Sequence, residues 1–321
     1  MRQKKIHSIL IPVLCPSEIN IVLKQALYFH EIYSSTITLL MVIPKLPIIN
    51  ALPFSKRVPV FLRKREAYSK LTLETGKFFN NDLPDFIQIK VEEGKYTYTI
   101  QNELNRKVYD LILIKECDDV KKLVNKLKAN SENILKRVDC PVMMLHEKWT
   151  KTGINEILIP IDITQKCKDS VMWALNHSKM FGARLKFVAI VNQNINVKNS
   201  LTYYRSKLIK EWILKNGIDC TFEIIKSSKK EMAQSLLNYA EKGNADLIML
   251  LTHENYIASN NYLGKFAKEI IHNSPKPVIS MSIRNKPMFK LLGAYNKYTR
   301  KRTETLNIKN SEWSNIRFGL Q

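Results

Sequence analysis

Two stretches of nearly the same sequence decide the fold: Ser8-Ile-Leu-Ile-Pro-Val13 and Glu156-Ile-Leu-Ile-Pro-Ile161. Each is a short apolar run that ends just before polar residues and a helical pattern. An apolar run of this length, without alternation, is typical of a strand that is buried on both faces. Because the run occurs twice in one chain, we predict two copies of one domain.

Two further markers recur near the end of each half. Tyr109-Asp-Leu-Ile-Leu-Ile114 matches Ala245-Asp-Leu-Ile-Met-Leu250, and Asp139-Cys-Pro-Val-Met143 matches Lys276-Pro-Val-Ile-Ser280. The aspartates of the first pair, Asp110 and Asp246, are 136 positions apart, and so are the prolines of the second pair. The equal separation predicts that the segment between the two markers has the same length in both halves.

Predicted strands alternate with predicted helices along both halves. The strands are expected at 9–13, 36–43, 86–91, 111–114 and 142–145, then at 157–161, 185–191, 220–225, 246–251 and 278–282. In the second half the helices between them are expected at 166–181, 201–215, 231–242 and 264–273. This alternation predicts parallel sheets covered on both faces. The predicted fold class is α/β, with two tandem, doubly wound, five-stranded domains at 1–148 and 153–285 and a basic tail at 286–321.

Glycines and prolines mark the connections. Gly182, Gly217 and Gly243 each follow a predicted helix, where a left-handed cap favours glycine. The segment Pro44–Pro59 contains four prolines, so we expect it to be extended and to act as a lid or a contact surface. Residues Lys148–Asn155 are the predicted linker.

Composition favours a cytosolic globular protein. The net charge of +22 is spread over both halves and is densest in the tail. The excess is consistent with solubility or with an acidic partner, and we favour solubility. The basic start followed by the apolar run at 9–15 resembles a signal segment, but the recurrence of that run in mid-chain favours a buried strand. The five cysteines are irregularly spaced, as expected for reduced core thiols rather than disulfides or a zinc site.

With these markers, both halves resemble the universal stress protein family, over roughly 8–146 and 155–283. The shared features are the opening I-L-I-P strand, the Asp-Leu-Ile strand and the closing helix followed by Pro-Val. The resemblance implies a Rossmann-like fold similar to the adenine-nucleotide α-hydrolases, and ATP binding in many members but not in all. It also implies dimerisation through the last strands, so we expect 142–145 and 278–282 to pair within one chain as an internal pseudo-dimer.

The second half keeps part of the nucleotide motif that the resemblance implies. Asp162 follows the first strand as the family's aspartate does, and Thr252-His253 stands where Ser-His often stands. Gly264 has the spacing of the motif's later glycine, and Lys265 replaces the following serine or threonine. An ammonium at a helix start can bind phosphate, so these five residues form the predicted ATP–magnesium site.

Other positions argue against that site. Leu251 and Glu254 replace the two leading glycines, where a side chain crowds the backbone approach and a carboxylate repels phosphate. A structural interpretation is that Asp162 caps the following helix and Gly264 only opens the last one. In the first half Leu14 holds the aspartate position, and Lys115, Asp118, Lys128 and Ala129 hold the motif positions, so we expect no ATP binding there.

We therefore expect a non-catalytic stress-response or regulatory protein that acts in the cytoplasm through contacts with another protein. The first alternative is a nucleotide sensor that uses the second half. The second alternative is a nucleic-acid or membrane-surface binder that uses the basic tail, which we disfavour. The sequence contains no P-loop, no dinucleotide-binding motif and no histidine–cysteine pair at metal-ligand spacing.

Overall fold

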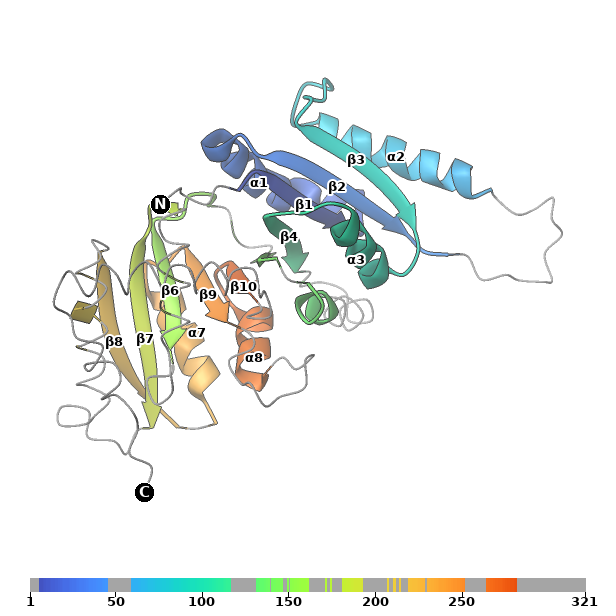
Figure 1. Cartoon of the computed structure of the whole chain (residues 1–321). Coiled ribbons are helices and arrows are strands. Elements are labelled where there is room, and N and C mark those ends of the chain that lie inside the picture. Colours follow the sequence, from blue (N-terminus) through green and yellow to red (C-terminus); the bar gives the residue numbers. More distant parts are fainter. Residues whose placement is uncertain are drawn as a thin grey trace, which may run out of the picture. The chain divides into compact units, whose positions relative to one another are not determined.

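The computed structural model describes residues 6–45, 59–116, 131–138, 140–146, 149, 151–161, 171, 174, 181–192, 207, 210, 211, 214, 219–228, 230–251 and 264–281 (Figure 1). Residues Met1–Ser282 form one compact unit. The domain boundaries at 148, 153 and 285 stay predictions, and the basic tail lies outside the described residues. No helix in the described ranges is long and apolar enough to span a bilayer.

The first half contains five strands. They are β1 (Ser8–Val13), β2 (Thr36–Ile43), β3 (Ile87–Glu93), β4 (Leu111–Glu116) and β5 (Val142–His146). The helices between them are the short 3₁₀ helix η1 (Pro16–Glu18), α1 (Ile19–Tyr33), α2 (Val60–Gly76) and α3 (Tyr96–Arg106), and residues 131–135 are also helical. All five predicted strands are confirmed to within two residues at each end.

The second half repeats the pattern. Its strands are β6 (Glu156–Ile161), β7 (Arg184–Asn192), β8 (Cys220–Ser227), β9 (Leu247–Leu251) and β10 (Val278–Met281). Its described helices are α7 (Met232–Lys242) and α8 (Lys265–Asn273). Most of the predicted helices 166–181 and 201–215 lies outside the described residues, although Val171 and Ala174 in the first of these ranges are buried.

The strands form one ten-stranded sheet in the order β3-β2-β1-β4-β5-β10-β9-β6-β7-β8. Within each half the described strands pair in parallel, and the order in space is the same in both halves. The halves meet where β5 and β10 pair antiparallel, with Met143 opposite Ile279. We call this junction the seam. The pairing predicted between the last strands of the two halves is therefore confirmed.

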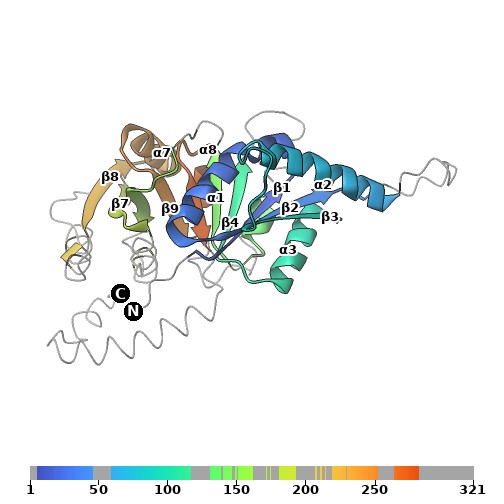
Figure 2. The same cartoon turned by 90° about the horizontal axis from the view of Figure 1, so that it is seen from above.

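Burial explains why these segments became strands. β1 has five buried residues in a row, and β5 is buried throughout, as expected for strands with helices on both faces. Helices α2 and α3 lie on opposite sides of β2 and β3 (Figures 1 and 2). One cluster of buried side chains runs across the seam, from Ile100 of α3 to Leu236 of α7 and Ile270 of α8. The apolar core on that side is shared by both halves.

The glycine predictions had different outcomes. Gly182 has φ +62°, so the left-handed cap is confirmed there, whereas Gly217 lies outside the described residues. The prediction for Gly243 was wrong, because its φ is −88°. A Cβ at Gly243 would lie 3.1 Å from the carbonyl oxygen of Tyr239, so lack of space favours glycine at this position.

The cysteine prediction also needs correction. Of the three described cysteines, Cys220 is buried and Cys140 is half-buried. Cys15 is exposed, because it follows the last residues of β1 and leaves the sheet before η1 begins. The apolar run at 9–13 is nevertheless a central buried strand, as predicted.

Candidate functional site

The candidate site of the second half lies at the carboxyl ends of β6 and β9. These two strands are parallel neighbours, with Leu158 opposite Ile248. Both strands continue for three residues beyond this pair, so they end level, at Ile161 and Leu251. From there the chain leads from β6 to β7 on one side and from β9 to β10 on the other. In open α/β sheets this reversal of strand order is where ligands bind.

The structure describes two of the five predicted site residues. Gly264 is the N-cap of α8, and its carbonyl accepts the N–H of Lys268 at 3.0 Å. Its φ of −59° does not require glycine. Lys265 is the first helical residue, and its side chain is 87% exposed, with Nζ 3.7 Å from Glu269 Oε1. This end of α8 therefore presents first-turn amides and one accessible ammonium, the groups that bind an anion.

The other three predicted residues lie outside the described residues. Asp162 follows β6 directly, and Thr252 and His253 follow β9 directly. The level strand ends agree with a site at this edge, but the convergence of all five side chains stays a prediction. The prediction that Gly264 opens the last helix is confirmed.

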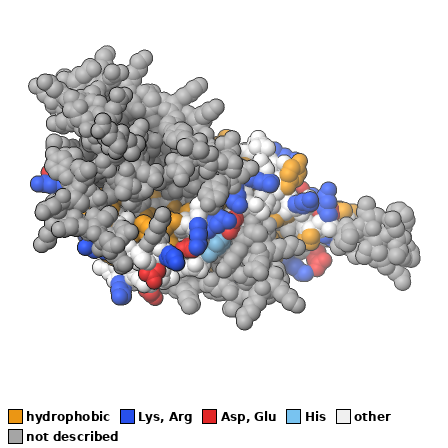
Figure 3. All heavy atoms as spheres, turned by 90° about the horizontal axis from the view of Figure 1, so that it is seen from below, with side chains coloured by type: hydrophobic (Ala, Val, Ile, Leu, Met, Phe, Trp, Pro, Cys, Tyr) orange, Lys and Arg blue, Asp and Glu red, His pale blue; other side chains and the backbone are white. Residues whose placement is uncertain are grey.

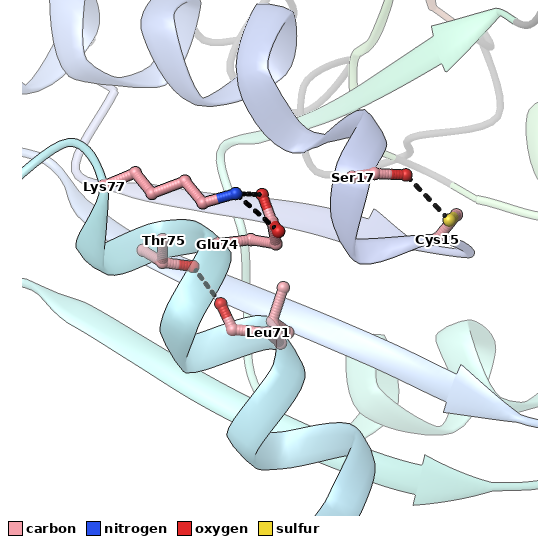
Figure 4. A network of polar contacts seen from close by, with 6 residues as sticks. All are labelled: Cys15, Ser17, Leu71, Glu74, Thr75 and Lys77. Atoms are coloured by element: carbon pink, nitrogen blue, oxygen red, sulfur yellow. Dashed lines mark hydrogen bonds and ion pairs between the residues drawn. The ribbon is translucent and has the colours of Figure 1, made fainter.

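The corresponding edge of the first half lies where β1 and β4 end. Leu14 follows β1, and its side chain is exposed. Because it is a leucine, this position offers neither a carboxylate nor a hydroxyl group. Just after Leu14, Cys15 Sγ and Ser17 Oγ lie 3.1 Å apart (Figure 4). The other contacts in this view lie within α2 and its C-cap, where Lys77 binds Glu74 and the Thr75 hydroxyl donates to the carbonyl of Leu71. The described part of this edge thus lacks the aspartate that would bind a nucleoside.

The comparisons with known proteins point to one fold. A universal stress protein from Archaeoglobus fulgidus superposes with a TM-score of 0.59 at 18% identity, covering 87% of this chain and 97% of its own. A putative universal stress protein from Pseudomonas aeruginosa gives a TM-score of 0.60 at 14% identity, covering 86% of this chain and 93% of its own. The fold is that of universal stress proteins. A functionally unknown protein from P. aeruginosa matches with a TM-score of 0.59 at 14% identity, with 86% and 92% covered.

The resemblance deduced from the sequence is therefore confirmed at the level of the fold. No family model matches the chain, and no curated protein matches it. The two matches named as universal stress proteins each extend over more than four-fifths of the present chain, so the likeness includes both halves. At these identities the universal stress protein fold is established, whereas ligand and activity have to be argued from the residues of this chain.

The structure contains one polar cluster that the sequence analysis did not predict. Glu132, on the helical segment before β5, binds Lys268 Nζ at 2.8 Å and His272 Nε2 at 3.3 Å, and both of these residues lie on α8. Burial alone would raise the pKa of Glu132, but the hydrogen bonds from Lys268 and His272 hold it below its ordinary value. The cluster joins the two halves beside the seam. The sequence does contain a signal for this contact: Glu132 and Lys268 are 136 positions apart, which is the separation between equivalent positions of the repeat.

Proposed function

We propose that this chain is a regulatory module with the universal stress protein fold, and that it acts by binding another protein rather than by catalysis. The universal stress protein fold is consistent with a role in the stress response. The position of the nucleotide-binding aspartate in the first half holds Leu14, which supports a structural or interaction role for that half. The irregular cysteines support a place in the cytosol, where thiols stay reduced.

The exposed side chains of α2 carry this proposal. Five large hydrophobic residues of this helix are exposed, namely Val60, Phe61, Leu62, Tyr68 and Leu73, and Phe61 is 67% exposed. Arg65, between them, is also exposed. On the described surface of Figure 3, Lys and Arg side chains lie among hydrophobic ones. Aromatic residues and arginine are the side chains that protein interfaces favour.

The start of α2 also lies beside the predicted contact segment. Arg63 donates a hydrogen bond to the carbonyl of Pro44 at 2.5 Å and lies 3.4 Å from Glu93. The two ends of the segment, Pro44 and Pro59, therefore both lie at the start of α2. Its own residues 46–58 lie outside the described residues, so its role as a lid or contact surface stays a prediction.

We expect a double substitution of Phe61→Ser and Leu62→Ser to remove partner binding while the fold is kept, because both side chains are exposed. Loss of one central aromatic contact typically costs at least about 2 kcal/mol, roughly a thirtyfold loss of affinity. The measurement is quantitative cross-linking and co-purification from cells under stress. Val108→Ser is the matched control, since Val108 is 85% exposed elsewhere. Equal capture by wild type and the double variant would refute a partner site on α2.

A second candidate function is nucleotide sensing by the second half. The observation that favours it is the exposed Lys265 at the start of α8, at the carboxyl edge of the sheet. In this proposal Asp162 contacts the adenosine side, Thr252 and His253 line the loop after β9, and Gly264 and Lys265 hold the phosphates. Magnesium would accompany the bound ATP.

Calorimetric titration with ATP and magnesium tests this second function. We expect micromolar binding that Asp162→Ala abolishes and that Lys265→Ala weakens about tenfold, because one charge-assisted phosphate contact is lost. Lys77→Ala is the control, since Lys77 is exposed just after the end of α2 in the first half. No heat, and no shift in melting temperature at millimolar ATP, would leave the protein-binding function alone.

A further inference from the structure

The seam has an internal two-fold relation. Met143 and Ile279 are 136 positions apart, so they are equivalent positions of the two halves, and they lie directly opposite each other. On either side of this pair, Met144 faces Val278 and Val142 faces Ser280. Each contact is thus matched by its equivalent across a local axis between Met143 and Ile279. Such an arrangement is what two copies of one domain adopt in an isologous pair.

The charged cluster beside the seam obeys the same relation with opposite charges. Glu132 and Lys268 are equivalent positions, and their Oε2 and Nζ atoms are 2.8 Å apart. Lys136 and His272 are also equivalent, and each lies near the Glu132 carboxylate, at 3.6 Å and 3.3 Å. At the first of these positions the two halves therefore carry charges of opposite sign, and the carboxylate of the first half receives cations from both.

The apolar side chains around this cluster do not distinguish the halves. Ile134 and Ile270 are equivalent positions, and so are Leu135 and Ile271. All four are buried in the cluster of side chains that crosses the seam. An apolar surface of this kind fits any pairing of the two domain copies, because burial of hydrocarbon is not directional.

We propose that Glu132 and Lys268 make the seam selective, so that a second half pairs with a first half and not with another second half. The same local axis in a pair of second halves would bring two Lys268 ammonium groups together, with His272 beside them and without the Glu132 carboxylate. Like charges at a partly buried contact oppose that pairing, which is the usual way in which specificity is added to an apolar interface. This inference goes beyond the proposed function, because it concerns which copies of the domain associate.

A charge-reversal cycle in the full chain tests the proposal. Lys268→Glu and Glu132→Lys each place like charges at the seam, and we expect each to lower the melting temperature by about 2–5 °C. The double variant restores an opposite pair and should recover at least half of the summed loss. Lys24→Glu is the control, because it makes the same charge change at an exposed position of α1, outside the cluster, and should shift the melting temperature by under about 1 °C.

Hydrogen exchange gives the second readout. In the Lys268→Glu chain we expect the backbone amides of β5 and β10 to exchange faster, while those of β7 keep their wild-type rates. If charge reversal prevents folding, Lys268→Gln and Glu132→Gln provide the same cycle without repulsion, and the expected sign of the coupling is the same. Additive losses in either cycle, or unchanged exchange at the seam, would overturn the proposal.

Discussion

Replacing Asp246 with alanine is expected to lower the free energy of unfolding by about 3 kcal/mol, since two hydrogen bonds to a buried carboxylate are lost. Asp246 is 5% exposed, and its Oδ2 accepts the backbone N–H groups of Asn155 and Glu156 at 2.9 and 3.2 Å. These amides precede and begin β6, the central strand of the second half. Alanine would leave both amides without this acceptor at a partly buried contact. The measurement is denaturant unfolding of the full chain.

The first half contains the same device. Asp110 Oδ2 accepts the backbone N–H groups of His7 and Ser8 at 2.9 and 3.1 Å, and also the hydroxyl of Ser8 at 3.1 Å. We expect Asp110→Ala to be destabilising for the same reason, but by less than Asp246→Ala, because Asp110 is only half-buried. The repeated Asp-Leu-Ile sequence is thus explained by a backbone contact between the fourth and first strands of each half.

An exposed aspartate provides the control. Asp219 pairs with Arg184 at 3.1 Å, but its side chain is largely exposed, so Asp219→Ala should change the free energy of unfolding by under about 1 kcal/mol. Asp246→Asn keeps one acceptor oxygen, so its loss in the free energy of unfolding should lie between those of Asp246→Ala and Asp219→Ala. Equal stability of the Asp246→Ala and Asp219→Ala chains would show that the buried carboxylate does not hold the strand in place.

Much of the fold could be predicted because parallel strands buried on both faces leave continuous apolar runs in the sequence. β2 has the predicted bounds, and the 136-residue separation placed β5 and β10 at equivalent positions. Gly243 was misjudged because a glycine after a helix is selected either by a left-handed φ or by lack of space, and sequence alone does not separate these causes. Cys15 was misjudged because an apolar run does not show at which residue the chain leaves the sheet.

The candidate site was harder to predict, since its residues come from loops. Gly264 and Lys265 are described because α8 fixes them, whereas Asp162, Thr252 and His253 follow strand ends. The Glu132–Lys268 contact was missed because the repeat was identified from residues that the halves share. Equivalent positions that differ in charge, such as Glu132 and Lys268, are not part of that shared pattern. These positions distinguish the two sides of the seam.

The second large effect is expected at Glu103, a buried carboxylate of α3. Its Oε1 accepts a hydrogen bond from Lys90 Nζ at 2.7 Å and another from the hydroxyl of Tyr109 at 2.6 Å, and the Glu103 side chain is 4% exposed. Lys90→Met would leave the carboxylate buried with only the tyrosine as donor. Removing one partner of a fully buried ion pair lowers the free energy of unfolding by about 3–5 kcal/mol. Because the Lys90 side chain is 39% exposed, we expect a smaller loss of about 2 kcal/mol.

The dependence on pH follows from the pKa of Glu103. Burial alone would raise that pKa, but the hydrogen bonds from Lys90 and Tyr109 and the charges of Lys90 and Arg106 lower it below its ordinary value of 4.5. A carboxyl group whose pKa is lowered by folding stabilises the folded state above its unfolded pKa. That contribution is present above about pH 4.5 and is lost as the pH falls through the folded pKa.

A triple variant separates the ion pair from simple loss of packing. Lys90→Met, Glu103→Leu and Tyr109→Phe together replace the cluster by apolar groups of similar size, which is often neutral for buried pairs. We expect this chain to be more stable than Lys90→Met alone and to lose less stability than wild type below about pH 4.5. A triple variant that is less stable than the single one would show that the polar cluster is needed for packing.

The second half also has an ion pair at the register position of Lys90, but a glutamate stands there in place of the lysine. Lys90 on β3 lies opposite Leu40, and Glu223 on β8 lies opposite Val188, which are equivalent register positions. Glu223 pairs with Lys186 at 3.3 Å. In the second half the partner lies on the neighbouring strand β7, whereas in the first half it lies on α3. Exchanging Lys90 and Glu103 keeps opposite charges at the two positions, so it should cost less than removing either charge alone.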